Sequence, residues 1–148
     1  MNLDFGSGYN PKTGYLPCDF TSNPKLDFYC LDYKIYDKNL KIVKPNTFKN
    51  IFCRNVLHHI ENLELIIAEL FRVLECNGKL IVIEPNKDHY YQNFMFDSLW
   101  YRFVNNRTDI WFSKNYRDYI TILNKLFSTI DYNLENEKEF VNCKKGVC

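Results

Sequence analysis

The sequence predicts one α/β domain over residues 1–148, with a mostly parallel sheet that ends in a C-terminal antiparallel hairpin. Three observations support this prediction. A strand, an amphipathic helix and a second strand follow one another with short joins between residues 51 and 83. Short apolar runs that end in aspartate precede this unit, and alternating apolar residues follow it. We expect the sheet to be abbreviated at its N-terminus, because the chain begins almost inside its first strand.

The first third of the chain predicts three short strands, at residues 3–5, 15–20 and 28–31. The first is apolar and runs directly into the turn Gly6-Ser7-Gly8. Proline and glycine interrupt the spaces between the strands. Since a parallel crossover normally takes a dozen residues or more, the roughly ten residues between Gly8 and Asp19 leave room for a turn or two of helix at most.

The middle of the chain predicts a βαβ unit. Residues 51–53 form an apolar run typical of a buried strand, and Asn62 is a suitable N-cap for the helix that follows. The helix is predicted from one continuous apolar stripe: Leu63, Ile66, Ile67, Leu70, Phe71 and Leu74. Asn77-Gly78 is expected to end it with a left-handed cap. Residues 80–83 are continuously apolar, which indicates a strand buried on both faces.

The last third predicts a second helix and the closing hairpin. Residues 90–103 are rich in aromatic side chains, partly at helical spacing, and either pack in the core or form a lid over an apolar substrate. Ser113 is the expected cap of a helix with an apolar face at Tyr116, Tyr119, Ile120, Leu123 and Phe127. Ile130, Tyr132 and Leu134 alternate as in a half-buried strand, and residues 140–141 fit a returning strand.

Composition limits the functional classes. The chain is 46% hydrophobic and 25% charged, as expected for a globular protein, and its net charge of +1 argues against a general nucleic-acid or membrane-surface binder. The six cysteines form no C-x-x-C pair and stand at no zinc-site spacing from histidine, so we expect no metal. We expect free, mostly buried thiols and a cytoplasmic protein.

Three aspartates stand at predicted strand ends: Asp4, Asp19 and Asp32. Ligands of open parallel sheets bind at the carboxyl ends of the strands, where these carboxylates would meet the glycine turn. They could hold an amine, a ribose diol and an adenine amino group. Alternatively, Asp19 and Asp32 only cap turns, and spacing does not separate the two interpretations. Pro11 stands where a dinucleotide-binding turn needs its third glycine, which argues against NAD.

Three ordered blocks resemble the class I S-adenosylmethionine-dependent methyltransferases, and most closely their type 11-like branch. Residues 3–15 are similar to L-x-L-G-S-G-x-x-P-x-x-G-[YW], residues 48–60 to F-D-x-[IV]-x4-[VL]-L-H-H-[IV], and residues 69–82 to E-[IL]-x-R-V-L-x-x-G-G-x-L-x-[IV]. Lys49 replaces the aspartate of the second pattern, and Cys76-Asn77-Gly78 replaces Pro-Gly-Gly. The resemblance implies a Rossmann-like fold of seven-strand type and a methyl-transfer reaction. Family members usually carry a further helix before the first strand.

The resemblance also implies the cofactor, S-adenosylmethionine, and the residues that contact it. Gly6, Ser7 and Gly8 would lie under its methionine part, with Asp4 near its amino group. Asp19 would bind the ribose hydroxyls and Phe20 would pack on the adenine. The remaining contacts follow from the same resemblance: Asp32 to the adenine amino group, Tyr33 beside the ring, and Arg54 and Asn55 on the sulfonium side.

The catalytic and substrate residues are expected near the same strand ends. His59 is a candidate general base, because its pKa suits proton transfer near neutrality, although it or His58 could instead cap a helix or pack beneath the cofactor. Glu84 would either orient the substrate or pair with Lys87. The residues just after the strand, His89, Tyr90 and Tyr91, are assigned to the substrate side.

These observations together predict transfer of a methyl group to an unidentified acceptor, which near-neutral charge suggests is a small molecule; tRNA or a capped RNA end stays an alternative. A second hypothesis is a non-catalytic, cofactor-binding or partner subunit. Either a homo-oligomer or a partner chain would then cover the open N-terminal side. No apolar run reaches the roughly 18 residues of a membrane-spanning helix.

Overall fold

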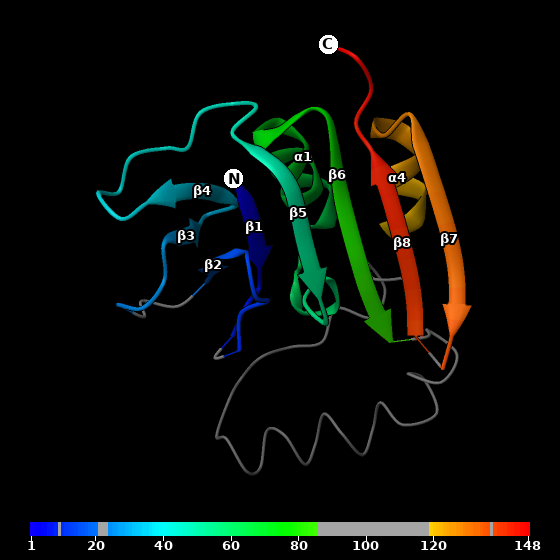
Figure 1. The fold of residues 1–148 in the computed structure, drawn as a ribbon, viewed down its shortest axis with the longest axis horizontal. Helices are drawn as coiled ribbons and strands as arrows, with labels where there is room; N and C mark the ends of the chain where they lie inside the picture. The colour runs from blue at the N-terminus through cyan, green and yellow to red at the C-terminus, as the bar shows by residue number, and fades with distance from the viewer. Residues whose placement is uncertain (9, 21–23, 86–118, 137) are drawn as a thin grey trace.

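The computed structural model describes residues 1–8, 10–20, 24–85, 119–136 and 138–148. Eight strands form one sheet in the order β4-β3-β2-β1-β5-β6-β8-β7 (Figure 1). The strands are β1 (Asn2–Phe5), β2 (Leu16–Asp19), β3 (Phe28–Leu31), β4 (Lys34–Asp37), β5 (Phe48–Arg54), β6 (Leu74–Pro85), β7 (Thr129–Glu135) and β8 (Lys138–Lys144). The described helices are the 3₁₀ turn η1 (Leu57–His59), α1 (Leu63–Val73) and α4 (Tyr119–Leu126).

The sheet is mostly parallel, as predicted. Strands β3, β2, β1, β5 and β6 are parallel neighbours, while β4 at one edge and the pair β8–β7 at the other run antiparallel. The predicted C-terminal hairpin is present, and Glu135 pairs with Lys138 at its turn. Parallel strands end at one edge of a sheet, so the residues that follow β1, β2, β3, β5 and β6 gather at the lower edge in Figure 1.

The βαβ unit β5–α1–β6 is confirmed. Asn62 caps α1, because its side-chain oxygen accepts from the Leu65 N–H at 3.1 Å. The prediction that Asn77-Gly78 ends the helix is wrong. The helix ends at Val73, and Leu74 is already extended and pairs with Phe48 of β5. Asn77 does have a left-handed backbone (φ 61°), but it lies inside β6.

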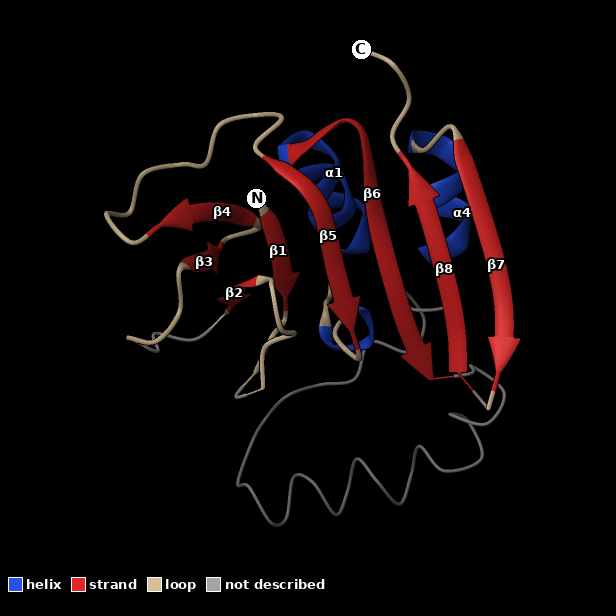
Figure 2. Cartoon of the chain, in the orientation of Figure 1, coloured by secondary structure: helices blue, strands red, loops and turns tan. Residues whose placement is uncertain are grey.

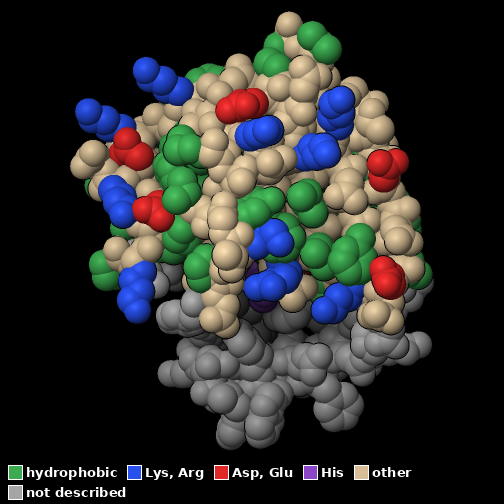
Figure 3. All heavy atoms as spheres, in the orientation of Figure 1, with side chains coloured by type: hydrophobic (Ala, Val, Ile, Leu, Met, Phe, Trp, Pro, Cys, Tyr) green, Lys and Arg blue, Asp and Glu red, His purple; other side chains and the backbone are tan. Residues whose placement is uncertain are grey.

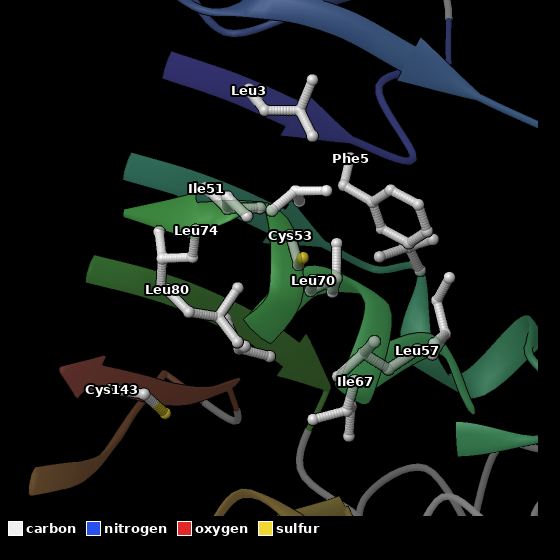
Figure 4. Close-up of a cluster of buried hydrophobic side chains, with 14 of the residues drawn as sticks. Leu3, Phe5, Ile51, Cys53, Leu57, Ile67, Leu70, Leu74, Leu80 and Cys143 are labelled. Atoms are coloured by element: carbon white, nitrogen blue, oxygen red, sulfur yellow. The ribbon is translucent and has the colours of Figure 1, made fainter. Parts of the chain in front are cut away.

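The hydrophobic core lies between the sheet and the two α-helices, which cover the same face (Figure 2). Figure 4 shows side chains of β1, β5, β6 and α1 meeting in this layer. Strand β6 contributes Leu80 and Val82, which are 1% and 0% exposed. Its alternate residues, Ile81 and Ile83, point to the other face and are only half-buried, so the predicted burial of this strand on both faces holds for one face.

The second face of the sheet carries no helix among the described residues. Hydrophobic side chains reach its surface in the middle, with lysine and arginine around them (Figure 3). Part of this face is covered by the segment after the glycine turn. Tyr15 packs on Phe52 of β5 with ring centroids 6.0 Å apart, and the Lys12 ammonium lies 4.8 Å from the Phe52 centroid.

Strand β4 and its hairpin with β3 were not anticipated by the sequence analysis. Asp32 and Tyr33 form the two-residue turn, and both have positive φ angles (47° and 58°), as hairpin turns of type I′ require. The buried Glu69 of α1 attaches this hairpin to the helix layer. Its Oε1 accepts from the Ile35 N–H at 2.9 Å, and both its oxygens accept from the Arg72 guanidinium.

The C-terminal elements confirm the predicted hairpin and the described part of the predicted helix, with one difference. Tyr119, Leu123 and Phe127 are buried, while the predicted cap Ser113, Tyr116 and the aromatic segment 90–103 lie outside the described residues. The expected half-burial of β7 is wrong at Tyr132 and Leu134, which are 51% and 50% exposed. Among the described strands it pairs only with β8, and it forms the edge of the sheet.

Cysteine chemistry differs from expectation at two positions. Cys76 and Cys148 form a disulfide, with Cα atoms 5.6 Å apart, so the prediction that all thiols are free is wrong for this pair. Cysteine motifs such as C-x-x-C involve residues that are close in sequence, whereas Cys76 and Cys148 are 72 residues apart. The other four cysteines are free and buried. Within the described ranges no group of residues could hold a metal ion, and none of the helices there has the length and apolarity to cross a membrane.

Candidate active site

The glycine turn after β1 is held tightly against β2. The N–H groups of Gly6 and Ser7 both donate to the Cys18 carbonyl, at 2.8 and 3.2 Å. Gly6 has a φ of +73°, and a Cβ at this position would overlap the side chain of Val56. Only glycine combines this backbone with this close approach, so the loop after β5 and the turn after β1 are packed on each other.

Asp19, at the end of β2, closes the turn from the other side. Its Oδ2 accepts from the Gly8 N–H and its Oδ1 from the Phe20 N–H, both at 2.8 Å. The sequence left open whether Asp19 caps a turn or faces a ligand. The structure places it as a cap of the glycine turn, with its carboxylate partly accessible beside that turn. A carboxylate accepts about four hydrogen bonds, so further acceptor capacity remains.

Asp4 lies under the same turn and is 2% exposed. Its Oδ2 accepts from the Lys12 N–H at 2.6 Å. Burial raises the pKa of this carboxyl above its usual value, while the Lys12 N–H and the nearby Arg54 and Lys12 charges act in the opposite direction. Arg54 donates to the Asn10 carbonyl at 3.4 Å, so the end of β5 contacts the segment after the glycine turn.

Two features of the turn fit an extended polar ligand such as the methionine part of S-adenosylmethionine. The Ser7 hydroxyl is buried and is the one buried side-chain polar atom in the described chain without a hydrogen-bond partner. A buried hydroxyl without a partner costs free energy, which a polar ligand atom would recover. At Gly8, a Cβ would meet no atom of the described residues within 4 Å, so these residues leave the backbone open to close approach from this side.

The predicted adenine residues are less closely assembled. Phe20 follows Asp19, is 41% exposed and packs edge-on against Phe5 at 5.3 Å. Asp32 is exposed and Tyr33 half-buried, both in the β3–β4 turn. Tyr33 lines a cavity of about 630 Å³ together with residues 61–64 and the α4 residues Thr121, Ile122 and Lys125. The described lining of that cavity includes no residue of the glycine turn.

The loop after β5 is organised by Glu84, which is 0% exposed. Its Oε1 accepts from the N–H groups of Val56 and Leu57, at 2.9 and 2.8 Å, and its Oε2 lies 2.6 Å from Nδ1 of His58. Asn55, with φ 52°, donates its N–H to the Ile83 carbonyl at 2.9 Å. Both Glu84 oxygens therefore bond to the protein, in contrast to the expected role in orienting a substrate.

The two histidines of the second block have different environments. His58 is 4% exposed and bonded to Glu84, in agreement with the structural role considered for it. His59 is exposed and its ring lies 4.1 Å from that of His58. The substrate-side predictions His89, Tyr90 and Tyr91, and Lys87 as the partner of Glu84, lie outside the described residues.

Two residues of this site were missed from sequence: Lys12 supplies the backbone N–H that binds Asp4, and Val56 fills the space beside Gly6. Glu139 of β8, which pairs in register with Glu84, was also missed, but it lies outside the site. Glu139 is 2% exposed and accepts from the Tyr119 and Tyr132 hydroxyls, at 2.5 and 3.2 Å. Glu139 stands two residues before Val141, so both side chains lie on the same face of the strand. This spacing could have indicated that Glu139 is buried, but not that it is paired with Glu84.

Comparison with known proteins identifies the family and the fold of the chain. The family profile described as "Methyltransferase domain" matches residues 3–82. Uncharacterized protein MJ0638 of Methanocaldococcus jannaschii is 36% identical over 87 residues, which cover 57% of this chain and 38% of that protein, so the chain matches well under half of that relative's length.

Two solved structures share the fold at low sequence identity. A Methanococcus maripaludis protein, provisionally described as an S-adenosyl-L-methionine-dependent methyltransferase, superimposes with a TM-score of 0.63 at 17% identity, over 99% of this chain and 78% of the other. Haemonchus contortus phosphoethanolamine N-methyltransferase 2, in complex with S-adenosyl-L-methionine, gives 0.64 at 12% identity, over 98% and 48%. With its strand order, its glycine turn and the match over residues 3–82, the chain belongs to the class I S-adenosylmethionine-dependent methyltransferases.

Proposed function

We propose that this chain transfers the methyl group of S-adenosylmethionine to a small-molecule acceptor, with S-adenosylhomocysteine as the second product. The observation that carries the proposal is the buried hydroxyl of Ser7, which has no hydrogen-bond partner among the described residues, in a turn that Asp19 caps at Gly8. Such a turn lies at the carboxyl edge of a parallel sheet. It suits a cofactor whose methionine part has amino and carboxyl groups that can contact the protein main chain.

We assign the cofactor contacts from this arrangement. Asp4 and Ser7 lie nearest the amino and carboxyl groups of the methionine part, and Asp19 accepts from the ribose hydroxyls with its remaining lone pairs. Phe20 is exposed enough to pack on the adenine ring. Asp32 and Tyr33 contact the adenine from the β3–β4 turn, and Arg54 and Asn55 line the sulfonium side.

The protein's own contribution to the chemistry is mainly positioning. S-adenosylmethionine supplies an already activated methyl group, so the chain must bind it, align the acceptor and exclude water. A base is needed only where the acceptor loses a proton. His59 is exposed next to the loop after β5 and is the candidate for that role. His89, Tyr90 and Tyr91 remain the candidates for acceptor contacts.

The net charge of +1 supports a small acceptor over a long nucleic acid, which would favour a strongly basic surface. A tRNA or a capped RNA end is the alternative acceptor class. A methylation screen that compares small-molecule pools with total RNA, using radiolabelled cofactor, distinguishes the two.

Calorimetric titration with S-adenosylmethionine and S-adenosylhomocysteine tests the proposed cofactor. We expect one-to-one binding by the wild-type protein and a loss of at least about tenfold in affinity for Asp19→Ala. Asp27→Ala is the matched control, because Asp27 lies between β2 and β3 and pairs with the exposed Lys38. No binding by folded wild-type protein would overturn the proposal, and unchanged affinity of Asp19→Ala would overturn the ribose assignment.

A second candidate function is a non-catalytic, cofactor-binding or partner subunit. The face of the sheet opposite α1 and α4 has no described helix, although parallel strands are normally covered on both faces. A second copy or another chain on this face would supply the cover. Sedimentation analysis of the purified protein, with methyl transfer measured before and after co-purified chains are removed, separates this candidate from a self-sufficient enzyme.

We also propose a cytoplasmic location. Four buried free thiols support it, since unpaired cysteines are typical of reducing compartments. The Cys76–Cys148 disulfide argues in the other direction, and fractionation of cells that express the tagged protein decides between them.

A further inference from the structure

We propose that Glu84 is a positioning residue for the cofactor turn, acting through Val56. The inference rests on the proposed function and adds a residue to it. Glu84 belongs to β6 and Gly6 follows β1, two strands separated by β5 in the sheet. The connection between them runs through the loop after β5, which contacts both.

The first half of the connection is the attachment of the loop to Glu84. The carboxylate binds two successive backbone N–H groups, of Val56 and Leu57, at 2.9 and 2.8 Å. Hydrogen bonds to an ionised carboxylate are about twice as strong as those between neutral groups. The Glu84 side chain that accepts these two bonds is 0% exposed. His58 on Oε2 at 2.6 Å fixes the rotation of the carboxylate.

The second half is the contact between Val56 and the glycine turn. The Val56 side chain occupies the space where a Cβ of residue 6 would be, so the turn can approach no closer to the loop. On its other side the turn is bonded to Cys18 and Asp19 of β2. The distance of the glycine turn from the loop after β5 therefore depends on where Glu84 holds Val56. The positions of Ser7 and Gly8 depend on it in turn.

Glu139 offers a matched control for Glu84. The two residues are register partners on neighbouring strands and are 0% and 2% exposed. Glu139 accepts from the Tyr119 and Tyr132 hydroxyls and bonds to no residue of the loop after β5 in the contacts described above. Its replacement disturbs a buried carboxylate of the same kind without removing the support of Val56.

The test combines Glu84→Gln, Val56→Ala, their double variant and Glu139→Gln. For each folded variant, affinity for S-adenosylhomocysteine is measured by calorimetry and amide exchange by mass spectrometry. We expect Glu84→Gln and Val56→Ala each to weaken binding by about tenfold, because small displacements of a binding group are costly. The double variant should be hardly weaker than either single one, and Glu139→Gln should stay within about twofold of wild type.

Amide exchange gives a readout that does not require binding. In Glu84→Gln, exchange should become faster at residues 56–57 and at residues 6–8, while Glu139→Gln leaves residues 6–8 unchanged. Equal effects of Glu84→Gln and Glu139→Gln on affinity, additive effects in the double variant, or unchanged exchange at residues 6–8 would overturn the inference. If Glu84→Gln does not fold, unchanged affinity of Val56→Ala overturns it. If wild type binds no S-adenosylhomocysteine, the proposed function is overturned instead. Amide exchange would then still test the contact between Val56 and the glycine turn.

Discussion

Glu84 of β6 and Glu139 of β8 face each other directly in the antiparallel ladder, and both are almost completely buried. Each carboxylate has its own set of donors: two backbone N–H groups and His58 for Glu84, and two tyrosine hydroxyls for Glu139. Buried carboxylates are costly unless they are hydrogen-bonded, so these donors are what makes the pair tolerable. The arrangement also separates two roles, since only Glu84 bonds to the loop near the glycine turn.

Removing the Tyr119 hydroxyl should destabilise the fold without affecting the site. Tyr119→Phe leaves the buried Glu139 carboxylate with a weaker donor set, and we expect a loss of about 2 kcal/mol in the free energy of unfolding. Urea denaturation measures this change. Affinity for S-adenosylhomocysteine should be unchanged, because Tyr119 lies on α4, outside the loop and the turn. A variant as stable as wild type would show that the hydrogen bond contributes nothing.

Alanine substitutions at Gly8 and Gly14 permit a matched comparison of stability and cofactor binding. Gly8 and Gly14 both have positive φ angles (56° and 83°), and at neither would a Cβ come within 4 Å of an atom in the part of the chain that the structure describes. Alanine at either position should therefore cost about 1 kcal/mol of stability through backbone strain alone. Only Gly8→Ala should weaken binding of S-adenosylhomocysteine, because only Gly8 lies in the proposed cofactor turn. Equal binding by the two variants would remove Gly8 from the site.

Stability at low pH should depend on Glu69. Burial alone would raise the pKa of this carboxyl, but the Arg72, Ile35 and Lys34 donors together hold it below its usual value. A carboxyl with a lowered pKa in the folded state stabilises the protein above its unfolded pKa, and the contribution is lost as pH falls through the folded pKa. We therefore expect wild type to lose more stability than Glu69→Gln between about pH 5 and pH 3.

At neutral pH the same substitution should cost about 2 kcal/mol, since charged hydrogen bonds to a buried group are lost. Lys34→Ala is the control. The Lys34 side chain is 51% exposed, and its loss leaves the Ile35 and Arg72 donors of Glu69 in place, so we expect a cost of about 0.5 kcal/mol or less. Thermal or urea unfolding across the pH range gives both numbers. A pH-independent difference between wild type and Glu69→Gln would contradict the lowered pKa.

Thiol titration should separate the two classes of cysteine. Burial raises the pKa of Cys30 and Cys143 to about 12 and that of Cys18 and Cys53 well above the usual value. Because the thiolate is the reactive form, the folded protein should react slowly with a disulfide reagent at about pH 8. Unfolded protein should expose four thiols before reduction and six after it. Six thiols before reduction would show that Cys76 and Cys148 are unpaired in the sample.

Local sequence patterns predicted most of the elements. The spacing of the apolar residues after Asn62 predicted α1 and its N-cap, because an amphipathic stripe and its cap are properties of contiguous residues. The strands at residues 3–5 and 28–31 and the C-terminal hairpin were predicted for the same reason. The end of the helix was predicted at Asn77-Gly78 but lies at Val73, because Leu74 pairs with Phe48 of β5. Strand β4 escaped prediction because its turn, Asp32-Tyr33, lacks the glycine or asparagine that marks a two-residue hairpin.

For the candidate site, too, some features follow from the sequence and others depend on the tertiary structure. By itself the sequence determined which residues follow the strands, and hence that the glycine turn, Asp4, Asp19 and Arg54 would share one edge of a parallel sheet. Tertiary structure alone decided what each one touches. From the sequence, Glu84 was expected either to orient a substrate or to pair with Lys87, since it ends a strand. In the structure it is buried and instead binds the N–H groups of Val56 and Leu57, in a loop 28 residues away in sequence. Cys76 and Cys148 likewise meet only because β6 and the C-terminal segment are brought together. Periodicity and turn chemistry act between sequence neighbours, whereas burial and hydrogen-bond pairing depend on which distant segments the sheet order places side by side.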